Sequence, residues 1–251
     1  MRCYRCPRHG LRGPLASAAV LTILTAITYA PRASLFTHLT ESVNGSRVED
    51  LVVRLADKGL LLLVATAGIL AVVTWLRDRP GFLRLAVGGL GAIVSYATSE
   101  AVKTLVAQPR PCHTLDVVTA LTCPTATDWS WPSNHATIAG SIAVACLLVA
   151  PRLWPLLVPL AAIVATARVG AGVHYLHDIT AGLALGTLIT ALISTYATPA
   201  LARIPLVQRA TRRSAPRADP PRRRAISTGA LHVPPTAHPE EGSTSRGLLG
   251  G

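Results

Sequence analysis

Three short clusters of polar residues stand at the ends of long apolar runs, and their side chains suit phosphate chemistry. The clusters hold Lys103 and Arg110; then Ser133, Asn134 and His135; then Arg168, His174 and Asp178. A phosphoester is anionic, and the transition state for its transfer spreads charge over several oxygens, so catalysis depends on positioned charges. The residue types therefore indicate phosphate binding and transfer.

The three cations are the candidate phosphate ligands. Arginine offers a bidentate fork to phosphate oxygens, and lysine offers a point charge. Ser133 precedes an apolar run and suits the N-cap of a helix, while the first backbone N–H groups of that helix, near Asn134, would point at an anion. We therefore expect Lys103, Arg110, Ser133, Asn134 and Arg168 to bind phosphate.

The remaining groups fit a nucleophilic displacement. His174 and Asp178 are four residues apart, so in a helix they share a face and the carboxylate would hold the imidazole in one tautomer. An imidazole oriented in this way can attack phosphorus and form a phosphohistidine. His135, when protonated, could donate to the departing oxygen.

Two neighbours of these clusters have plainer interpretations. His177, beside Asp178, is either a substitute orienting residue or an interfacial polar residue, and we favour the second. Glu100 lies one turn before Lys103. Because a carboxylate inside a membrane normally has a partner, we expect Glu100 to be paired structurally.

The elements that must position these residues are membrane helices. Half of the 251 residues are apolar, only 14% are charged and the mean hydropathy is +0.43, whereas soluble domains carry about 25% charged residues. About 20 residues cross a bilayer as a helix. The sequence therefore predicts an all-α fold, a six-transmembrane-helix bundle. The apolar runs lie near 15–30, 59–76, 85–107, 135–150, 153–173 and 179–198.

The predicted organisation has three parts: an amino-terminal tail over 1–12, a membrane domain over 13–198, and a disordered Arg- and Pro-rich tail over 199–251. The first run is short, and the residues before Pro31 weakly resemble a signal-peptidase site. A retained first helix and a cleaved signal both stay open, and we favour the retained helix.

The distribution of basic residues predicts the orientation in the membrane. Six spans place both termini on one side, and 17 of the 24 lysines and arginines then fall on that side. By the positive-inside rule both termini are cytoplasmic. All three polar clusters consequently lie at the extracytoplasmic face of the cell membrane.

The basic tail and the cysteines suggest few partners. Nine arginines follow residue 200; their position directly after a span fits anionic lipid headgroups better than nucleic acid, which we do not expect as a partner. Cys3, Cys6 and His9 offer too few ligands for a structural zinc site. Cys112 and Cys123 flank a polar loop and could form a disulfide if that loop faces an oxidising compartment. The oligomeric state stays open.

The combined spacing resembles a known signature. Six residues separate Lys103 from Arg110-Pro111, Pro132-Ser133-Asn134-His135 follows, and five and three residues separate Arg168, His174 and Asp178. This pattern is similar to the three-part motif of the type 2 phosphatidic acid phosphatase superfamily, which includes vanadium-dependent haloperoxidases. The resemblance covers roughly residues 55–198.

This resemblance implies a six-helix membrane fold, a metal-free phosphatase site near the outer membrane face, and roles for eight residues. His174 would be the nucleophile, Asp178 the residue that orients His174, and His135 the general acid. The phosphate ligands would be Lys103, Arg110, Ser133, Asn134 (through its backbone) and Arg168. Two residues depart from the family pattern. Asn134 replaces a usual glycine and keeps the backbone N–H, and Ala167 replaces a usual serine and loses one hydroxyl.

Three functions compete. The leading hypothesis is a phosphatase acting on a lipid phosphate: phosphatidic acid, phosphatidylglycerol phosphate, or a polyprenyl phosphate or pyrophosphate. A vanadate-dependent haloperoxidase would use the same cations, but those proteins are typically soluble. A non-catalytic or transport-type membrane protein is the third, supported only by Ala167. The choice between monoester and pyrophosphate stays open.

Overall fold

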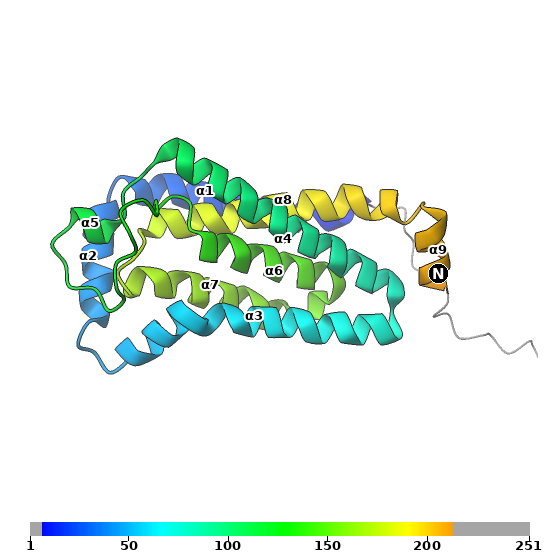
Figure 1. The fold of residues 1–251 in the computed structure, drawn as a ribbon, viewed down its shortest axis with the longest axis horizontal. Coiled ribbons are helices and arrows are strands. Elements are labelled where there is room, and N and C mark those ends of the chain that lie inside the picture. Colours follow the sequence, from blue (N-terminus) through cyan, green and yellow to red (C-terminus); the bar gives the residue numbers. More distant parts are fainter. Residues whose placement is uncertain (1–6, 213–251) are drawn as a thin grey trace, which may run out of the picture. The chain divides into compact units, whose positions relative to one another are not determined.

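Helices carry nearly all of the apolar sequence in the computed structural model, which describes residues 7–212 (Figure 1). No strand occurs within these residues. The helices are α1 (Pro7–Tyr29), α2 (Arg32–Val43), α3 (Glu49–Arg77), α4 (Arg79–Val106), α5 (Pro111–Thr114), α6 (Asn134–Val149), η1 (Pro151–Leu153), α7 (Trp154–Gly170), α8 (Leu176–Leu201) and α9 (Pro205–Arg212). The prediction of an all-helical membrane fold is confirmed for this part of the chain.

Five segments are long and apolar enough to cross a membrane: Leu11–Tyr29, Glu49–Arg77, Arg79–Thr114, Pro151–Gly170 and Leu176–Leu201. The sixth predicted span corresponds to α6, which has 16 residues. At 1.5 Å per residue α6 is about 24 Å long, short of the roughly 30 Å hydrocarbon core. The six predicted runs therefore become five helical segments long and apolar enough to span a membrane and one shorter apolar helix.

The short helix α6 lies among its neighbours rather than against lipid. It packs against α3, α4, α7 and α8, and most of its small residues are buried. Close packing depends on glycines of α8: a Cβ at Gly182 or Gly186 would overlap the backbone carbonyl of Ser133 or Thr137 on α6. Small residues let membrane helices approach closely. Surrounded by protein, α6 does not have to match the thickness of the bilayer.

The ends of the predicted elements differ from the sequence-based expectation. The polar stretch after the first run forms α2, and α3 begins at Glu49, ten residues before the apolar run. The tail expected to be disordered from residue 199 is helical at its start, in the end of α8 and in α9. Polar helical turns carry no apolar signal, so the hydropathy pattern missed them. Cys3, Cys6 and residues 213–251 lie outside the described residues.

A buried apolar cluster supports the end of the bundle where the polar motifs lie. Phe36 of α2, Tyr175 and Ile179 belong to it and are almost fully buried. The Thr40 hydroxyl donates to the carbonyl oxygen of Val169 at 3.1 Å, which ties α2 to the end of α7. The connection that carries His174 is therefore fixed between α2, α7 and α8.

Candidate active site

The three motifs meet at one end of the helices. Lys103 is in the last turn of α4 and Arg168 in the last turn of α7, while Ser133 precedes α6 and Asp178 is in the first turn of α8. Because these helices alternate in direction, these helix ends lie together, at the end of the bundle that holds α2 and α5 (Figure 1). The structure thus brings all eight predicted site residues to one region.

His174 and Asp178 are in contact, but not as two residues of one helix. His174 lies in the connection before α8, which begins at Leu176. The Asp178 carboxylate turns back from the first helical turn: its Oδ2 accepts the backbone N–H of Tyr175 at 2.8 Å and lies 3.3 Å from His174 Nδ1. The predicted contact exists, and the expected geometry of a shared helix face was wrong. The carboxylate reaches His174 because it caps the helix start.

The partners of His174 determine which nitrogen is free to react. Arg110 Nη1 lies 3.0 Å from His174 Nε2, and a guanidinium can only donate a hydrogen bond. Nε2 is therefore the acceptor, and the ring proton is on Nδ1, beside Asp178 Oδ2. The Ser130 hydroxyl lies 3.4 Å from the same Nδ1. The Nε2 lone pair points at Arg110 and would have to be released from this hydrogen bond before it could attack phosphorus.

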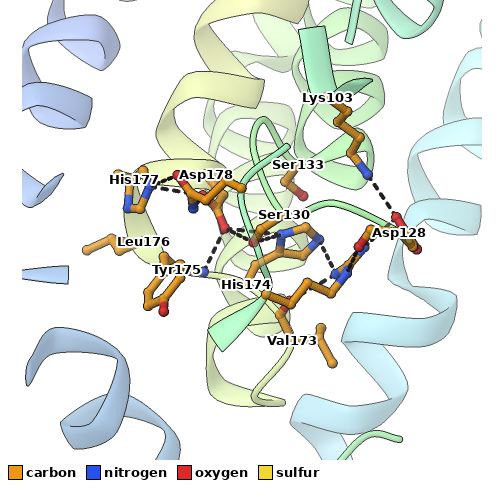
Figure 2. Close-up of polar contacts among 12 residues, drawn as sticks. Lys103, Asp128, Ser130, Ser133, Val173, His174, Tyr175, Leu176, His177 and Asp178 are labelled. Carbon is orange, nitrogen blue, oxygen red and sulfur yellow. Dashed lines mark hydrogen bonds and ion pairs between the residues drawn. The ribbon is translucent and has the colours of Figure 1, made fainter. Parts of the chain in front are cut away.

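Asp178 is fully buried and surrounded by donors (Figure 2). Ser130 donates to Oδ2 and Gln108 Nε2 donates to Oδ1 at 3.1 Å. His177 Nε2 also lies 3.1 Å from Oδ1 and 3.2 Å from Gln108 Oε1. The favoured interpretation of His177 as an interfacial residue was wrong, because its side chain is 1% exposed and helps to hold the carboxylate.

Two of the three cations share an unexpected partner. Arg110 Nη2 and Lys103 Nζ lie 2.9 Å and 3.2 Å from Asp128 Oδ1. The Arg110 guanidinium also donates from Nε to the Asp128 carbonyl at 2.7 Å and from Nη1 to the Val173 carbonyl at 2.9 Å. Both cationic side chains are buried, whereas Asp128 is half-exposed. Figure 2 shows Lys103 reaching toward Asp128.

Other predicted ligands keep polar atoms without a protein partner. Ser133 Oγ is buried and makes no hydrogen bond, so Ser133 occupies the N-cap position of α6 without capping it through its side chain. Arg168 donates from Nη1 to the Ala56 carbonyl at 3.2 Å, and its buried Nε is unpaired. Unsatisfied buried donors are costly. A bound phosphate oxygen would satisfy both groups.

The two imidazoles lie within electrostatic reach of each other. His135 interacts with the charges of Arg168, Arg110 and Lys103 and is itself among the charges that act on His174. His135 is half-buried in the first turn of α6. The second imidazole is therefore within range of the same cationic charges that act on His174.

Asn134 and Glu100 form the structural pairing that was expected for Glu100. The Asn134 side chain donates to the Glu100 carboxylate and accepts from Ser99 Oγ at 2.7 Å. Glu100 does have a partner, as expected, and that partner is on α6. The Asn134 side chain is thus turned toward α4, which leaves only its backbone N–H, at the start of α6, for an anion.

Ala167, the position of the missing hydroxyl, lies in an apolar contact. It is buried with Ala56 of α3 and Ala171.

Cys112 and Cys123 are joined by a disulfide, with His113 beside them: His113 Nε2 lies 2.8 Å from the Pro124 carbonyl. This pair closes the loop that follows Arg110.

Sequence reasoning missed Gln108, Asp128 and Ser130. Gln108 lies inside the first motif, and Asp128 and Ser130 lie in the polar connection before the second, where apolar periodicity gives no register. The Ser130 backbone N–H donates to the Gln108 carbonyl at 2.8 Å, which folds this connection back onto the site. Only their closeness in sequence to Arg110 and Ser133 could have indicated them.

The charges of the site also affect the ionisation of His174 and Asp128, which lie outside the helices. Burial, followed by the charges of Arg110 and Arg168, holds the pKa of His174 well below its ordinary value of 6.5. Partial burial by itself raises the pKa of Asp128, but its hydrogen bond and charge interactions with Arg110 and Lys103 outweigh burial and lower that pKa. His174 is therefore neutral and Asp128 ionised at neutral pH.

Comparison with known proteins identifies the motif-bearing region. Residues 84–201 match the model of the PAP2 superfamily. An undecaprenyl-diphosphatase from Sulfolobus acidocaldarius is 38% identical over 101 residues, covering 40% of this chain and 48% of the relative. A decaprenylphosphoryl-5-phosphoribose phosphatase from Mycobacterium tuberculosis is 36% identical over 107 residues, covering 43% and 58%. The match thus spans about half the length of these curated relatives.

A solved structure shares the fold. The crystal structure of a transmembrane PAP2-type phosphatidylglycerolphosphate phosphatase from Bacillus subtilis superposes with a TM-score of 0.53 at 19% sequence identity, covering 74% of this chain and 96% of the other. At this identity the likeness concerns the fold alone.

Proposed function

We propose that this chain is a membrane phosphatase, because its residues 84–201 match the model of the PAP2 superfamily, the family that the three motifs indicated. It hydrolyses a lipid phosphate monoester or pyrophosphate through a phosphohistidine on His174. The observation that carries the proposal is the position of His174: Nδ1 faces Asp178 and Nε2 faces Arg110. No metal takes part in this mechanism.

In the first step, His174 Nε2 attacks the phosphorus atom. The new N–P bond forms as the P–O bond to the lipid alcohol, or to the second phosphate of a pyrophosphate, breaks. His135 gives its proton to the departing oxygen. The positive charge that develops on His174 is stabilised by Asp178, whose carboxylate is held by Ser130 and Gln108.

In the second step, water attacks the phosphohistidine. His135, now neutral, takes a proton from that water, the N–P bond breaks and inorganic phosphate leaves. Arg110, Arg168 and Lys103 neutralise the charge on the non-bridging oxygens throughout. The unpaired Ser133 Oγ and Arg168 Nε supply two further donors for these oxygens.

An apolar groove beside the site supports a lipid substrate. A cavity of about 220 Å³ lies between α1, α4 and α8. Its lining includes Val102, Trp131 and Pro132, which are chain neighbours of Lys103 and Ser133. A substrate whose phosphate lies on the cations could place its aliphatic tail in this groove, and burial of that tail would add roughly 0.8 kcal/mol per CH₂ group.

Among lipid phosphates, we favour a polyprenyl phosphate or pyrophosphate. Both curated relatives carry a polyprenyl group in the name of their substrate. The distribution of basic residues supports a site at the extracytoplasmic face of the cell membrane, with both termini in the cytoplasm.

The proposal predicts that His174→Ala abolishes phosphate release and that His135→Ala lowers it by roughly 10²–10⁴-fold, the usual contribution of a general acid. Purified protein in detergent with EDTA would be assayed on polyprenyl pyrophosphate, phosphatidic acid and phosphatidylglycerol phosphate. His38→Ala is the matched control, because His38 is exposed on α2. This control should keep the activity of the unsubstituted protein.

The outcomes separate the competing functions. Full activity of His174→Ala would refute the role of His174 as nucleophile, and loss of all activity in EDTA would refute a metal-free mechanism. Absence of phosphate release from every lipid, in protein that still binds inorganic phosphate, would instead favour a binding or transport role.

A further inference from the structure

Asp128 places a carboxylate where the proposed substrate would place a phosphate. Its Oδ1 lies 2.9 Å from Arg110 Nη2 and 3.2 Å from Lys103 Nζ. These are two of the three cations assigned to phosphate. The cations are buried, with side chains 3% and 5% exposed, while the Asp128 side chain is 46% exposed. The carboxylate is therefore the partner that can leave.

The backbone near Asp128 is fixed independently of its side chain. Arg110 Nε donates to the Asp128 carbonyl at 2.7 Å, the Asp128 N–H donates to the Thr125 carbonyl at 2.9 Å, and Ser130 N–H donates to Gln108. Rotation of the Asp128 side chain toward solvent would break only the two ion pairs. A substrate could thus displace the carboxylate while the loop and Arg110 keep their places.

Displacement has a cost that every anion entering the site must meet. A phosphate offers more oxygens and more negative charge than a carboxylate, so it can replace Asp128 on both cations. If the ion-paired state is occupied about 90–98% of the time, the apparent affinity of an incoming anion falls roughly 10- to 50-fold. A lipid recovers this loss through its tail, whereas inorganic phosphate has no tail.

We infer that Asp128 is an internal competitor: by occupying the cations it weakens the binding of every anion by the same factor, so that inorganic phosphate and small soluble phosphoesters, which have no tail, bind only weakly. The inference deepens the proposed function and rests on it. The Asp128 carboxylate also favours product release, because it returns to the cations as phosphate leaves. Asp128 takes no part in bond making.

The test compares phosphate binding by Asp128→Asn, Asp128→Glu and Asp116→Asn, measured by calorimetry on purified full-length protein in detergent. Asp116 lies in the same connection, is exposed and forms no ion pair among residues 7–212, so it is a matched charge control. Asp128→Asn should bind inorganic phosphate about 10- to 50-fold more tightly. Asp128→Glu and Asp116→Asn should bind it within about twofold of the unsubstituted protein, with Glu restoring the competitor.

A kinetic arm tests whether the cost is common to all anions. In Asp128→Asn, KM for a water-soluble phosphoester and KM for a polyprenyl phosphate should fall by the same factor, with little change in kcat. Equal or weaker phosphate binding in Asp128→Asn would overturn the inference and show that the carboxylate holds Arg110 in place. An equally large gain in phosphate affinity in Asp116→Asn would also overturn the inference, because the gain would then come from the change in net charge. The calorimetric result does not depend on turnover, so failure of the proposed function is recognised separately.

Discussion

At the scale of the residue, the ionisation of His174 governs the proposed reaction. A protonated imidazole cannot attack phosphorus, so activity requires the neutral form. In a free histidine the neutral form is lost as the pH falls through 6.5, whereas the site lowers the pKa of His174 well below that value. The cause is burial, followed by Arg110 and Arg168. The nucleophile thus stays competent in mildly acidic solution.

We therefore expect the acid limb of the pH profile of kcat/KM to lie below pH 6.5. The profile would be measured with a polyprenyl phosphate, with the ionisation of the substrate followed separately by phosphorus NMR. Replacing Arg110 with Gln should move the acid limb upward, because one cation that disfavours the imidazolium is lost. A half-maximal value at or above pH 6.5 in the unsubstituted protein would contradict this account.

At the scale of the element, the close approach of α6 and α8 positions Ser133 and His135. The Ser133 backbone N–H donates to the Asp178 carbonyl at 3.1 Å, so the starts of the two helices are joined directly. Further along, the absence of a side chain at Gly186 lets the helices touch. The second and third motifs depend on this contact for their relative position.

Gly186→Ala should therefore reduce both stability and activity. The added methyl group overlaps the Thr137 carbonyl, and overpacking of this kind costs about 1–3 kcal/mol. Thermal unfolding in detergent and phosphate release would be measured on the same preparations. Gly89→Ala is the control, since a Cβ at Gly89 meets nothing within 4 Å; helix propensity even favours alanine there by about 1 kcal/mol. Equal behaviour of the two variants would count against the packing argument.

At the scale of the whole molecule, the site lies at one end of the helices and the turn at η1 lies at the other. The proposed orientation places the site end outside the cell. Ala33 of α2 is exposed. It lies at the site end, because the ring of nearby Tyr29 contacts that of His177, with 5.1 Å between centroids. Arg152 is exposed in η1.

Ala33→Cys should react with a membrane-impermeant maleimide in intact cells, and Arg152→Cys only after lysis. The unsubstituted protein supplies the background labelling, which after lysis includes any reaction of Cys3 and Cys6; of the other cysteines, Cys146 is buried and Cys112 and Cys123 are paired. Labelling of Arg152→Cys, but not of Ala33→Cys, in intact cells would reverse the proposed topology. The catalytic proposal would be unaffected, because the site geometry is the same in either orientation.

The sequence by itself determined the helical class, the family and the identity of the motif residues. Apolar runs long enough to satisfy their backbone groups as helices predict spans without any tertiary information, and the spacing of Lys103, Ser133 and His174 was specific enough to indicate the superfamily whose model matches residues 84–201. These properties are local or follow fixed intervals along the chain.

Only the tertiary structure decided how the motif side chains are partnered. Asp178 reaches His174 as the cap of a helix start, His177 is buried beside the carboxylate, and Asp128 bridges two cations from a loop without periodicity. The length of α6 also followed from its surroundings, because a helix enclosed by protein does not have to match the bilayer. Such contacts join residues far apart in sequence or in irregular backbone, where no pattern along the chain specifies distance or direction.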